Sequence, residues 1–442
     1  MVGLTLEASG VDCAVGGLCE IALGNGASID AEVVGFIDER ALLMPIGDTR
    51  GLSPYARVRP KDTEARIAVG DALLGRVLDG RGLPLDGRGT PATVAWWPLH
   101  GRAPRALERQ PIAAPIDVGV RAINGLLRIG RGQRVGLFAG SGVGKSSLLA
   151  MMTRYTEAEV VVVGLVGERG REVNEFVHQT LGAEGMARAV VVATPADDPP
   201  LMRAQGALTA TAIAEYFREQ GRDVLLLIDS LTRFAQAQRE IGLAVGEPPT
   251  TKGYPPSVFA RLPDLVERAG NSASRGSLTA IYTVLTEADE SVDPIADSAR
   301  AILDGHIVLS RALAESGHYP AIDLEASISR LMNTIAPADD LQLAQRFRSL
   351  LARYNGSRDL ISLGLYRPGG DPTLDEAVLL QDRLSAYLRQ GEHEPVTLDQ
   401  SRAQLRSTLQ SGAHGTAAAA GGQPPGPDAG GARPNVAHGA GR

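Results

Sequence analysis

Residues 134–146 read RVGLFAGSGVGKS, and this stretch decides the fold. An apolar run suited to a buried strand, RVGLFA (134–139), leads into a glycine-rich loop, and the helix-favouring run SSLLAMMTRY (146–155) follows. Glycines let a backbone turn so tightly that its N–H groups converge on phosphate oxygens, and the next helix adds the positive end of its dipole. The stretch therefore predicts a phosphate-binding loop, with Ala139 in place of the pattern's first glycine.

Two other interpretations of this loop are weaker. A glycine-rich turn that binds nothing would not need the Gly144-Lys145-Ser146 ending or the flanking strand and helix. A dinucleotide-binding loop would carry a glycine where Lys145 stands. We expect Lys145 to reach the β- and γ-phosphates of a nucleotide and the Ser146 hydroxyl to hold Mg²⁺. The residues expected to surround the phosphates are Gly140, Ser141, Gly142, Val143, Gly144, Lys145, Ser146 and Ser147.

The sequence around the loop alternates between strand-like and helix-like segments. The strand candidates are RVGLFA (134–139), VVVVGLV (160–166), AVVVAT (189–194), VLLLID (224–229) and SLTAIYTVL (277–285). The helix candidates are residues 145–155, 170–181, 201–219 and 255–269. Short buried strands that alternate with helices predict a mostly parallel sheet with helices on both faces.

The flanks of this region have different patterns. The runs AEVVGFI (31–37) and ALLMPI (41–46) are rich in β-formers and predict a small β-barrel or sandwich. Residues after 337 show helical spacing, with Asp371-Pro372 marking the start of a second helix. The predicted divisions are an N-terminal β-domain at 1–68, a connector at 69–112, the α/β domain at 113–335, a helical domain at 336–411 and a disordered Gly/Ala/Pro tail at 412–442.

The bulk composition excludes several classes of protein. The net charge of -7 disfavours binding of nucleic acid by general electrostatics. The two cysteines, Cys13 and Cys19, are too few for a disulfide framework or a four-ligand zinc site. No apolar run approaches the roughly 18 residues that span a bilayer, and no signal peptide is visible. We expect a cytoplasmic protein that at most sits on a membrane surface.

Two carboxylates follow the ends of predicted strands. Asp229 closes VLLLID, where it would lie beside the phosphates and hold Mg²⁺ directly or through water. Glu168 follows VVVVGLV by two residues, where it would orient and deprotonate an attacking water. Taken alone, Asp229 could be a strand-ending turn residue, and Glu168 could belong to a solvated charged turn. Arg169 and Arg233 could face phosphate or pair with nearby carboxylates.

These pieces occur together in the family of rotary and export ATPases related to the F-type catalytic subunit. The chain resembles that family in AGSGVGKS (139–146), GERGREV (167–173), LLLIDSLTRFAQAQREIGLAVGEPP (225–249) and GYPPSVFARLPDLVERAG (253–270). The resemblance runs from about residue 4 to about residue 395. ILDGHIVLSR (302–311) and GHYPAIDLEASISR (317–330) resemble the type III export branch, and VVATPADDPPLMR (191–203) favours its flagellum-specific members.

The resemblance implies a fold, a reaction and residue roles. It implies a RecA-like P-loop core between an N-terminal β-barrel and a C-terminal helical domain, and Mg-dependent hydrolysis of ATP. Glu168 would polarise the water, and Arg169 would contact the γ-phosphate region. Arg330 would be an arginine finger that enters a neighbouring subunit's site; its alternative is a salt bridge. Tyr319 would pack on the adenine, and Tyr366 is a second candidate for that pocket.

The resemblance also implies partners and leaves alternatives open. It implies a homohexamer at the inner face of the membrane, with stator-like regulatory and central-stalk proteins, the export gate, export substrates and their chaperones as partners. The alternatives are an injectisome secretion ATPase, a rotary F/V-type subunit and a non-catalytic nucleotide-binding subunit. An RNA-translocating ring is disfavoured by the net charge, and we expect no nucleic acid. The chain opens with strand-like LTLEASG (4–10), whereas family members usually begin with an amphipathic helix that binds the stator-like partner.

Overall fold

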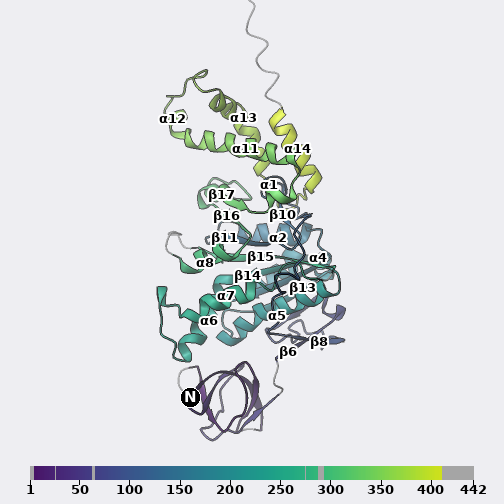
Figure 1. Cartoon of the computed structure of the whole chain (residues 1–442), viewed down its shortest axis with the longest axis vertical. Helices are drawn as coiled ribbons and strands as arrows, with labels where there is room; N and C mark the ends of the chain where they lie inside the picture. The colour runs from purple at the N-terminus through teal and green to yellow at the C-terminus, as the bar shows by residue number, and fades with distance from the viewer. Residues whose placement is uncertain (1–3, 25, 62–64, 274, 287–292, 411–442) are drawn as a thin grey trace, which may run out of the picture.

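The computed structural model describes residues 4–24, 26–61, 65–273, 275–286 and 293–410. Three bodies follow one another along the long axis of the chain: a small β-structure, a central α/β body and a helical end (Figure 1). The predicted combination of β-barrel, α/β core and helical domain is confirmed. The predicted tail at 412–442 lies outside the described residues.

The N-terminal body is an antiparallel sheet that curls into a barrel (Figure 1). Its strand order is β1-β4-β3-β2-β5. The strands are β1 (Leu6–Ser9), β2 (Leu18–Ala22), β3 (Ser28–Ile37), β4 (Arg40–Pro45) and β5 (Val58–Pro60). Alternate residues such as Cys19 and Ile21 point into its core, as the period-2 geometry of strands requires. Of the two predicted forms, barrel and sandwich, the barrel is present.

The central body is built on an eight-stranded sheet with the order β17-β16-β11-β15-β14-β12-β13-β7. All neighbours are parallel except β16 and β17. The strands are β7 (Arg76–Leu78), β11 (Arg134–Ala139), β12 (Val160–Val166), β13 (Ala189–Thr194), β14 (Asp223–Asp229), β15 (Ser277–Leu285), β16 (Gly305–Leu309) and β17 (Ile322–Ser329). The five predicted strands are thus present to within one residue at each end. The edge strand β7 comes from the stretch that we predicted to be a connector.

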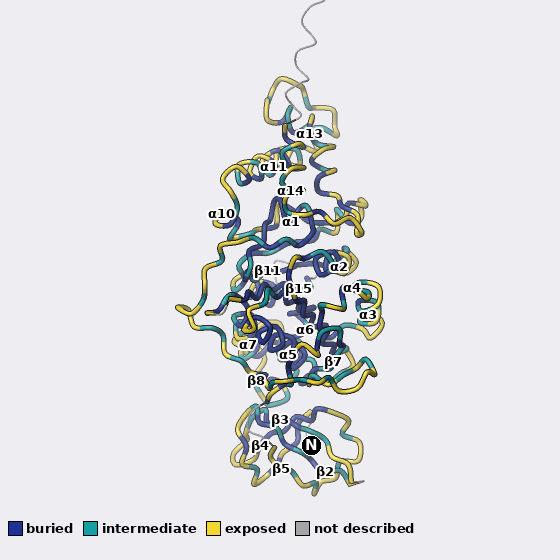
Figure 2. The backbone as a smooth tube through the Cα atoms, turned by 90° about the vertical axis from the view of Figure 1, so that its right-hand side faces the viewer, coloured by how far each residue is buried: buried dark blue, intermediate teal, exposed yellow. Residues whose placement is uncertain are grey.

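Helices cover both faces of this sheet, which leaves central strands such as β12 and β13 buried throughout (Figure 2). Along β12, Val161 and Val163 face one apolar core, whereas Val160 and Val162 face the other. The helices are α1 (Arg121–Leu126), α2 (Lys145–Tyr155), α3 (Gly170–Glu175), α4 (Gly182–Ala187), α5 (Pro200–Glu219), α6 (Leu231–Ala244), α7 (Pro256–Val266), α8 (Pro294–Ile302) and α9 (Arg311–Glu315). The continuous apolar strand runs of the sequence reflect this burial on two sides.

Shorter elements complete the central body. The pairs are β6 (Arg66–Val69) with β8 (Ala95–Pro98) and β9 (Pro115–Ile116) with β10 (Ile129–Gly130). The short helices are η1 (Asp71–Leu73), the π-helical η2 (Phe176–Leu181) and η3 (Thr251–Gly253). The predicted helix at 170–181 is therefore split into α3 and the π-helical η2.

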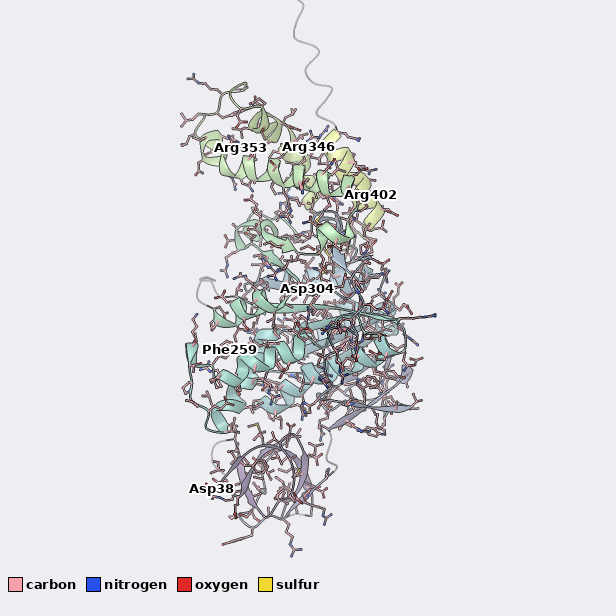
Figure 3. The ribbon with its side chains drawn as sticks, viewed as in Figure 1. Asp38, Phe259, Asp304, Arg346, Arg353 and Arg402 are labelled. Carbon is pink, nitrogen blue, oxygen red and sulfur yellow. The ribbon has the colours of Figure 1, made fainter. Side chains whose placement is uncertain are left out.

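The helical end shares an apolar core with the central body and is also joined to it by a buried ion pair. Its helices are α10 (Met332–Ile335), α11 (Ala338–Gly356), α12 (Arg358–Ser362), α13 (Pro372–Leu388) and α14 (Leu398–Gln410). Asp371 accepts hydrogen bonds from the first backbone N–H groups of α13 and caps it, as predicted. Asp340 on α11 lies 3.2 Å from Arg128 and 2.6 Å from Arg402 of α14, which Figure 3 labels. Removal of Asp340 would leave the buried Arg128 without a carboxylate partner, at a cost of about 3–5 kcal/mol.

Among the described residues, no helix combines the length and the apolar character that crossing a bilayer would require.

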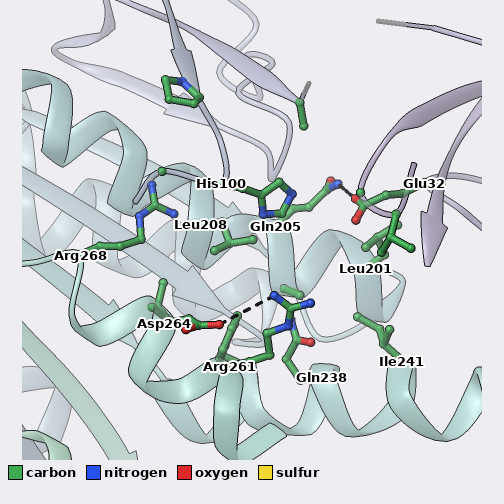
Figure 4. Close-up of a pocket in the computed structure, with 18 of the residues that line it drawn as sticks. Glu32, His100, Leu201, Gln205, Leu208, Gln238, Ile241, Arg261, Asp264 and Arg268 are labelled. Atoms are coloured by element: carbon green, nitrogen blue, oxygen red, sulfur yellow. Dashed lines mark hydrogen bonds and ion pairs between the residues drawn. The ribbon is translucent and has the colours of Figure 1, made fainter. Parts of the chain in front are cut away.

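The barrel meets the central body at a small apolar contact and a polar one. Met44 and Ile46 of the barrel pack on Leu201 and Met202 at the start of α5. Beside this contact lies a cavity of about 800 Å³ between the barrel, the segment that carries His100, and helices α5, α6 and α7 (Figure 4). There Gln205 of α5 donates a 2.8 Å hydrogen bond to the Glu32 carboxylate of β3. This bond is one polar link across the junction, and the ion pair of Arg81 with Asp30 of β3, 3.6 Å apart, is another.

Burial raises the pKa of Glu32 to about 7, against the opposing effects of the Gln205 hydrogen bond and the Arg261 charge. A carboxyl group whose pKa is higher in the folded state contributes stability that is present below its unfolded value of 4.5 and is lost as pH rises through about 7. The junction should therefore weaken between these two pH values.

We predict that Glu32→Gln, which keeps the neutral form, removes this pH dependence. The unfolding free energy of the wild type should fall relative to that of Glu32→Gln as pH rises from about 5 to about 8, by at most about 3 kcal/mol. Urea unfolding of both proteins at the two pH values measures the difference. Glu39→Gln, in the exposed turn between β3 and β4, is the control and should track the wild type. A constant difference between wild type and Glu32→Gln would contradict the prediction.

Candidate active site

The predicted phosphate loop lies at the carboxyl ends of the central parallel strands, between β11 and α2. It forms one wall of a cavity of about 1070 Å³. Seven of the eight predicted loop residues line this cavity: Gly140, Ser141, Gly142, Gly144, Lys145, Ser146 and Ser147. The eighth, Val143, is buried in the core beneath the loop and anchors it. Carboxyl-end crevices of parallel sheets are the usual place for a nucleotide.

Two glycines of the loop are required by its conformation. Gly142 and Gly144 have φ values of 75° and 89°, in the left-handed region where a side chain is strained. Gly144 also has the Tyr319 ring close above it, since a Cβ at Gly144 would lie 3.2 Å from that ring. Glycine at 144 therefore serves both the turn and the approach of the aromatic ring.

Lys145 is held between the two predicted carboxylates. Its Nζ lies 2.5 Å from Asp229 Oδ1, at the end of β14, and 3.5 Å from Glu168 Oε1. Burial opposes the charge on Lys145, but the attraction of the two carboxylates outweighs it and raises the lysine pKa. Asp229 also accepts a 2.6 Å hydrogen bond from Thr283 of the neighbouring strand β15. One cation between two carboxylates leaves the cluster with a net negative charge, which suits a further cation.

Glu168 has the environment of a general base. Burial and the negative charge of Asp229 raise its pKa to about 7, and Lys145 opposes them. A base is most effective when its pKa lies near the working pH. The turn that carries Glu168 is fixed from behind, because Gly167 has a φ of 70° and lies against the Arg233 side chain. The structure thus brings Lys145, Glu168 and Asp229 together as predicted.

The two arginines near Glu168 differ in their surroundings. The Arg169 side chain is 79% exposed at the cavity rim and lies 4.0 Å from Glu172. Arg233 lines the cavity, donates to Gln236, and has a buried Nε without a hydrogen-bond partner in the described part of the chain. Arg233 is therefore better placed than Arg169 to face a phosphate in this chain's own cavity.

The other predicted residues separate into those inside and outside the cavity. Tyr319 lines its rim, and its backbone carbonyl accepts a hydrogen bond from the backbone N–H of Gln390 in the helical domain. Tyr366 does not line the cavity; its hydroxyl donates to Asp375 in the helical domain. Arg330 is exposed at the end of β17, outside the cavity, where it donates to the carbonyl of Arg300.

Sequence reasoning missed three cavity or site residues: Thr283, Arg239 and Lys252. Thr283 could be found only by knowing that β15 pairs with β14, which places it beside Asp229. Arg239 lies six residues after Arg233 on α6, and this spacing alone does not predict that both side chains reach the same cavity.

A phosphate loop, a strand-end aspartate and a buried glutamate at the carboxyl edge of a parallel sheet define a P-loop ATPase. Family models refine this class. The beta-barrel domain of the ATP synthase alpha/beta family matches residues 1–62, and the nucleotide-binding domain of that family matches residues 119–329. The T3SS EscN ATPase C-terminal domain matches residues 336–407. The chain belongs to the ATP synthase alpha/beta family, in its type III export branch.

Individual relatives agree with this placement. The chain is 58% identical to the flagellum-specific ATP synthase of Pseudomonas aeruginosa, over 93% of this chain and 92% of that one. It is 51% identical to the type 3 secretion system ATPase of Xanthomonas euvesicatoria, over 88% of each chain. The solved structure of the assembled ATPase EscN from enteropathogenic E. coli is similar with a TM-score of 0.88 and 42% identity, covering 92% of this chain and 98% of that one.

We predict an acid limb in the pH profile of ATP hydrolysis. Because Glu168 must be ionised to accept a proton from water, kcat/KM should fall about tenfold per pH unit below about pH 7. Steady-state assays between about pH 5.5 and about pH 8.5 measure the limb. Glu184→Gln, on the exposed helix α4, should keep it unchanged. A profile that stays flat down to about pH 5.5 would argue against Glu168 as the base.

Proposed function

We propose that this chain hydrolyses ATP as one subunit of a six-membered ring that energises or primes type III export of flagellar proteins. The observation that carries the proposal is the meeting of Lys145, Asp229 and Glu168 in one cavity behind a phosphate loop. This set can neutralise phosphate charge, favour a divalent cation and activate water, which hydrolysis of a phosphoanhydride requires.

The loop and the rim supply the nucleotide contacts. The amides of residues 140–146 would cradle the phosphates, and the start of α2 would add favourable dipole charge. Lys145 would exchange its contact with Asp229 for the β- and γ-phosphates. Tyr319 would pack against the base. Tyr366 has no place in this arrangement, since its hydroxyl is bound to Asp375 and it lies outside the cavity.

The donor set fits Mg²⁺. Oxygen ligands are those that Mg²⁺ prefers, and the cavity offers the Ser146 hydroxyl and the Asp229 carboxylate. The net negative charge of the cluster around Lys145 also favours a divalent cation. When bound, Mg²⁺ would neutralise charge on the phosphates.

Glu168 would position a water in line with the terminal phosphate and accept its proton. With a pKa of about 7 it is ionised in a large share of molecules at neutral pH and still basic enough to take a proton. The Lys145 ammonium beside it would stabilise its ionised form, and Arg233 would face the departing phosphate from the other side of Gly167.

Arg330 would complete a neighbouring subunit's site. It is exposed on the surface of its own chain and does not reach its own cavity. An arginine supplied in trans to a phosphoryl-transfer site is worth roughly a thousandfold or more in rate. The similarity to the assembled ATPase EscN supports a ring.

The partners follow from the similar proteins. One similar structure is EscN in complex with its central stalk EscO, with a TM-score of 0.86, which supports a stalk protein as partner. We further propose a stator-like regulator, the export gate, export substrates and their chaperones as partners, at the cytoplasmic face of the inner membrane. The 58% identity to the flagellum-specific relative of Pseudomonas aeruginosa, against 51% to the secretion ATPase of Xanthomonas euvesicatoria, favours flagellar export over the injectisome.

We predict that inactive variants complement each other in a mixed ring. Arg330→Ala and Glu168→Gln should each lower the ATPase rate by roughly a thousandfold. A mixture that exchanges subunits should regain activity, because about a quarter of its sites combine an intact Glu168 with a neighbour's intact Arg330. ATPase assays of the separate and mixed proteins measure this recovery.

The control for that experiment is Arg346→Ala, on exposed α11, which should stay active by itself. The rate per wild-type chain should also rise with protein concentration as rings form. An active Arg330→Ala, together with a rate that does not change on dilution, would contradict shared sites.

We predict that deletion of the gene abolishes motility and the appearance of hook and filament proteins outside the cell. A plasmid with the wild-type gene should restore both, whereas Glu168→Gln should restore neither at equal protein level. Immunoblots of culture medium and swimming assays measure the outcome. Normal motility with loss of secreted effector proteins would assign the chain to an injectisome instead.

A further inference from the structure

The cavity holds three cations that the phosphate loop does not use: Arg233, Arg239 and Lys252. Among the described residues, none of the three pairs with a carboxylate. The carboxylates that share their cavity are engaged elsewhere: Glu172 lies beside Arg169, Glu175 pairs with Arg171, and Asp293 caps α8. Three cations without a counter-ion in one cavity favour an anionic ligand.

The helix α6 carries two of these cations, and the first of them lies at the reaction centre. Ser230 caps α6 directly after Asp229, and Arg233 follows in the first turn, beside Gly167 and Glu168. Arg239 lies six residues further along, about 9 Å from Arg233 along the helix axis. Both side chains line the cavity, so a second cation lies beyond the one at the reaction centre.

Further contacts order the surroundings of Arg239 and Lys252. The Arg239 guanidinium lies 5.3 Å from the centre of the Tyr254 ring, which fixes its plane. Lys252 sits in the short helix η3 with a left-handed φ of 47°. Thr250 closes this turn, because its backbone N–H and its hydroxyl both donate to the carbonyl of Tyr254. This turn places Lys252 in the same cavity as Arg239.

Hydrolysis of ATP creates an anion that such cations can bind. Cleavage yields inorganic phosphate beside ADP and Asp229, whose negative charges repel it. Lys145 remains with the phosphates of ADP. Arginine forks and a lysine ammonium are the groups that bind free phosphate best.

We propose that Arg239 and Lys252 form a second phosphate site, to which Arg233 passes inorganic phosphate after cleavage. The proposal rests on the function proposed above and adds the route by which its anionic product leaves. Arg239 and Lys252 are thus positioning residues for product release and take no part in bond cleavage.

The test separates cleavage from release in the full-length protein. A single turnover is followed by acid quench for ATP cleavage and by a fluorescent phosphate sensor for release. In Arg239→Ala/Lys252→Ala we expect cleavage within about twofold of wild type, release slowed about tenfold, and inhibition by added inorganic phosphate weakened about tenfold. Arg346→Ala, on α11 and outside the cavity lining, is the matched control and should release phosphate as the wild type does.

Charge-preserving Arg239→Lys and Lys252→Arg should restore most of the release rate, which distinguishes lost charge from misfolding. Release and phosphate inhibition like those of wild type would overturn the proposal. So would loss of cleavage in step with release, or loss of ring assembly by light scattering, which would assign the two cations to chemistry or to a neighbouring copy. If wild type itself does not cleave ATP, the proposed function fails first.

Discussion

An ion pair between Lys145 and Asp229 joins the phosphate loop to the end of β14, and the chemistry of the chain depends on it. The pair forms because two parallel strands, β11 and β14, end at the same edge of one sheet with β15 between them. The Asp229 carboxylate favours the charged form of the largely buried Lys145 ammonium. Both groups lie close enough to Glu168 to shift its pKa. Burial, the Asp229 charge and the lysine together place the Glu168 pKa near neutrality.

The position of the Lys145–Asp229 ion pair is fixed because helices bury the sheet on both faces. Because each central strand is covered on two sides, the loop sits on a rigid base, and Val143 reaches into that base. The barrel is attached through a small apolar contact and polar links such as that of Glu32 with Gln205. The helical end shares part of the apolar core of the central body and adds the ion pair of Asp340 with Arg128.

Much of this could be predicted because the signals were local. Five strands appeared as apolar runs, and Lys145, Asp229 and Glu168 follow strand ends that the topology must bring to one edge. What could not be predicted depends on pairing in space. The edge strand β7 has only three residues, too few for a sequence pattern. Thr283 contacts Asp229 only because their two strands are neighbours in the sheet. Lys252 lines the cavity from a turn in which its own backbone is left-handed, and no sequence pattern predicts that turn. Tyr366 has an aromatic ring that could pack on a base, but it lies in the helical domain, outside the cavity.

The hydrogen bond from the Gln390 N–H to the Tyr319 carbonyl has a mechanical consequence. The Gln390 side chain also donates to the carbonyl of Gly119 and accepts from the N–H of Arg121. This one buried residue therefore contacts both the rim of the site and the start of α1. A tilt of the C-terminal helices would therefore displace Tyr319, whose ring lies above Gly144. The linkage is reciprocal, because a free-energy coupling acts equally in both directions. A displacement of the C-terminal helices should therefore shift Tyr319 at the rim of the cavity, and a change at the rim should shift those helices in turn.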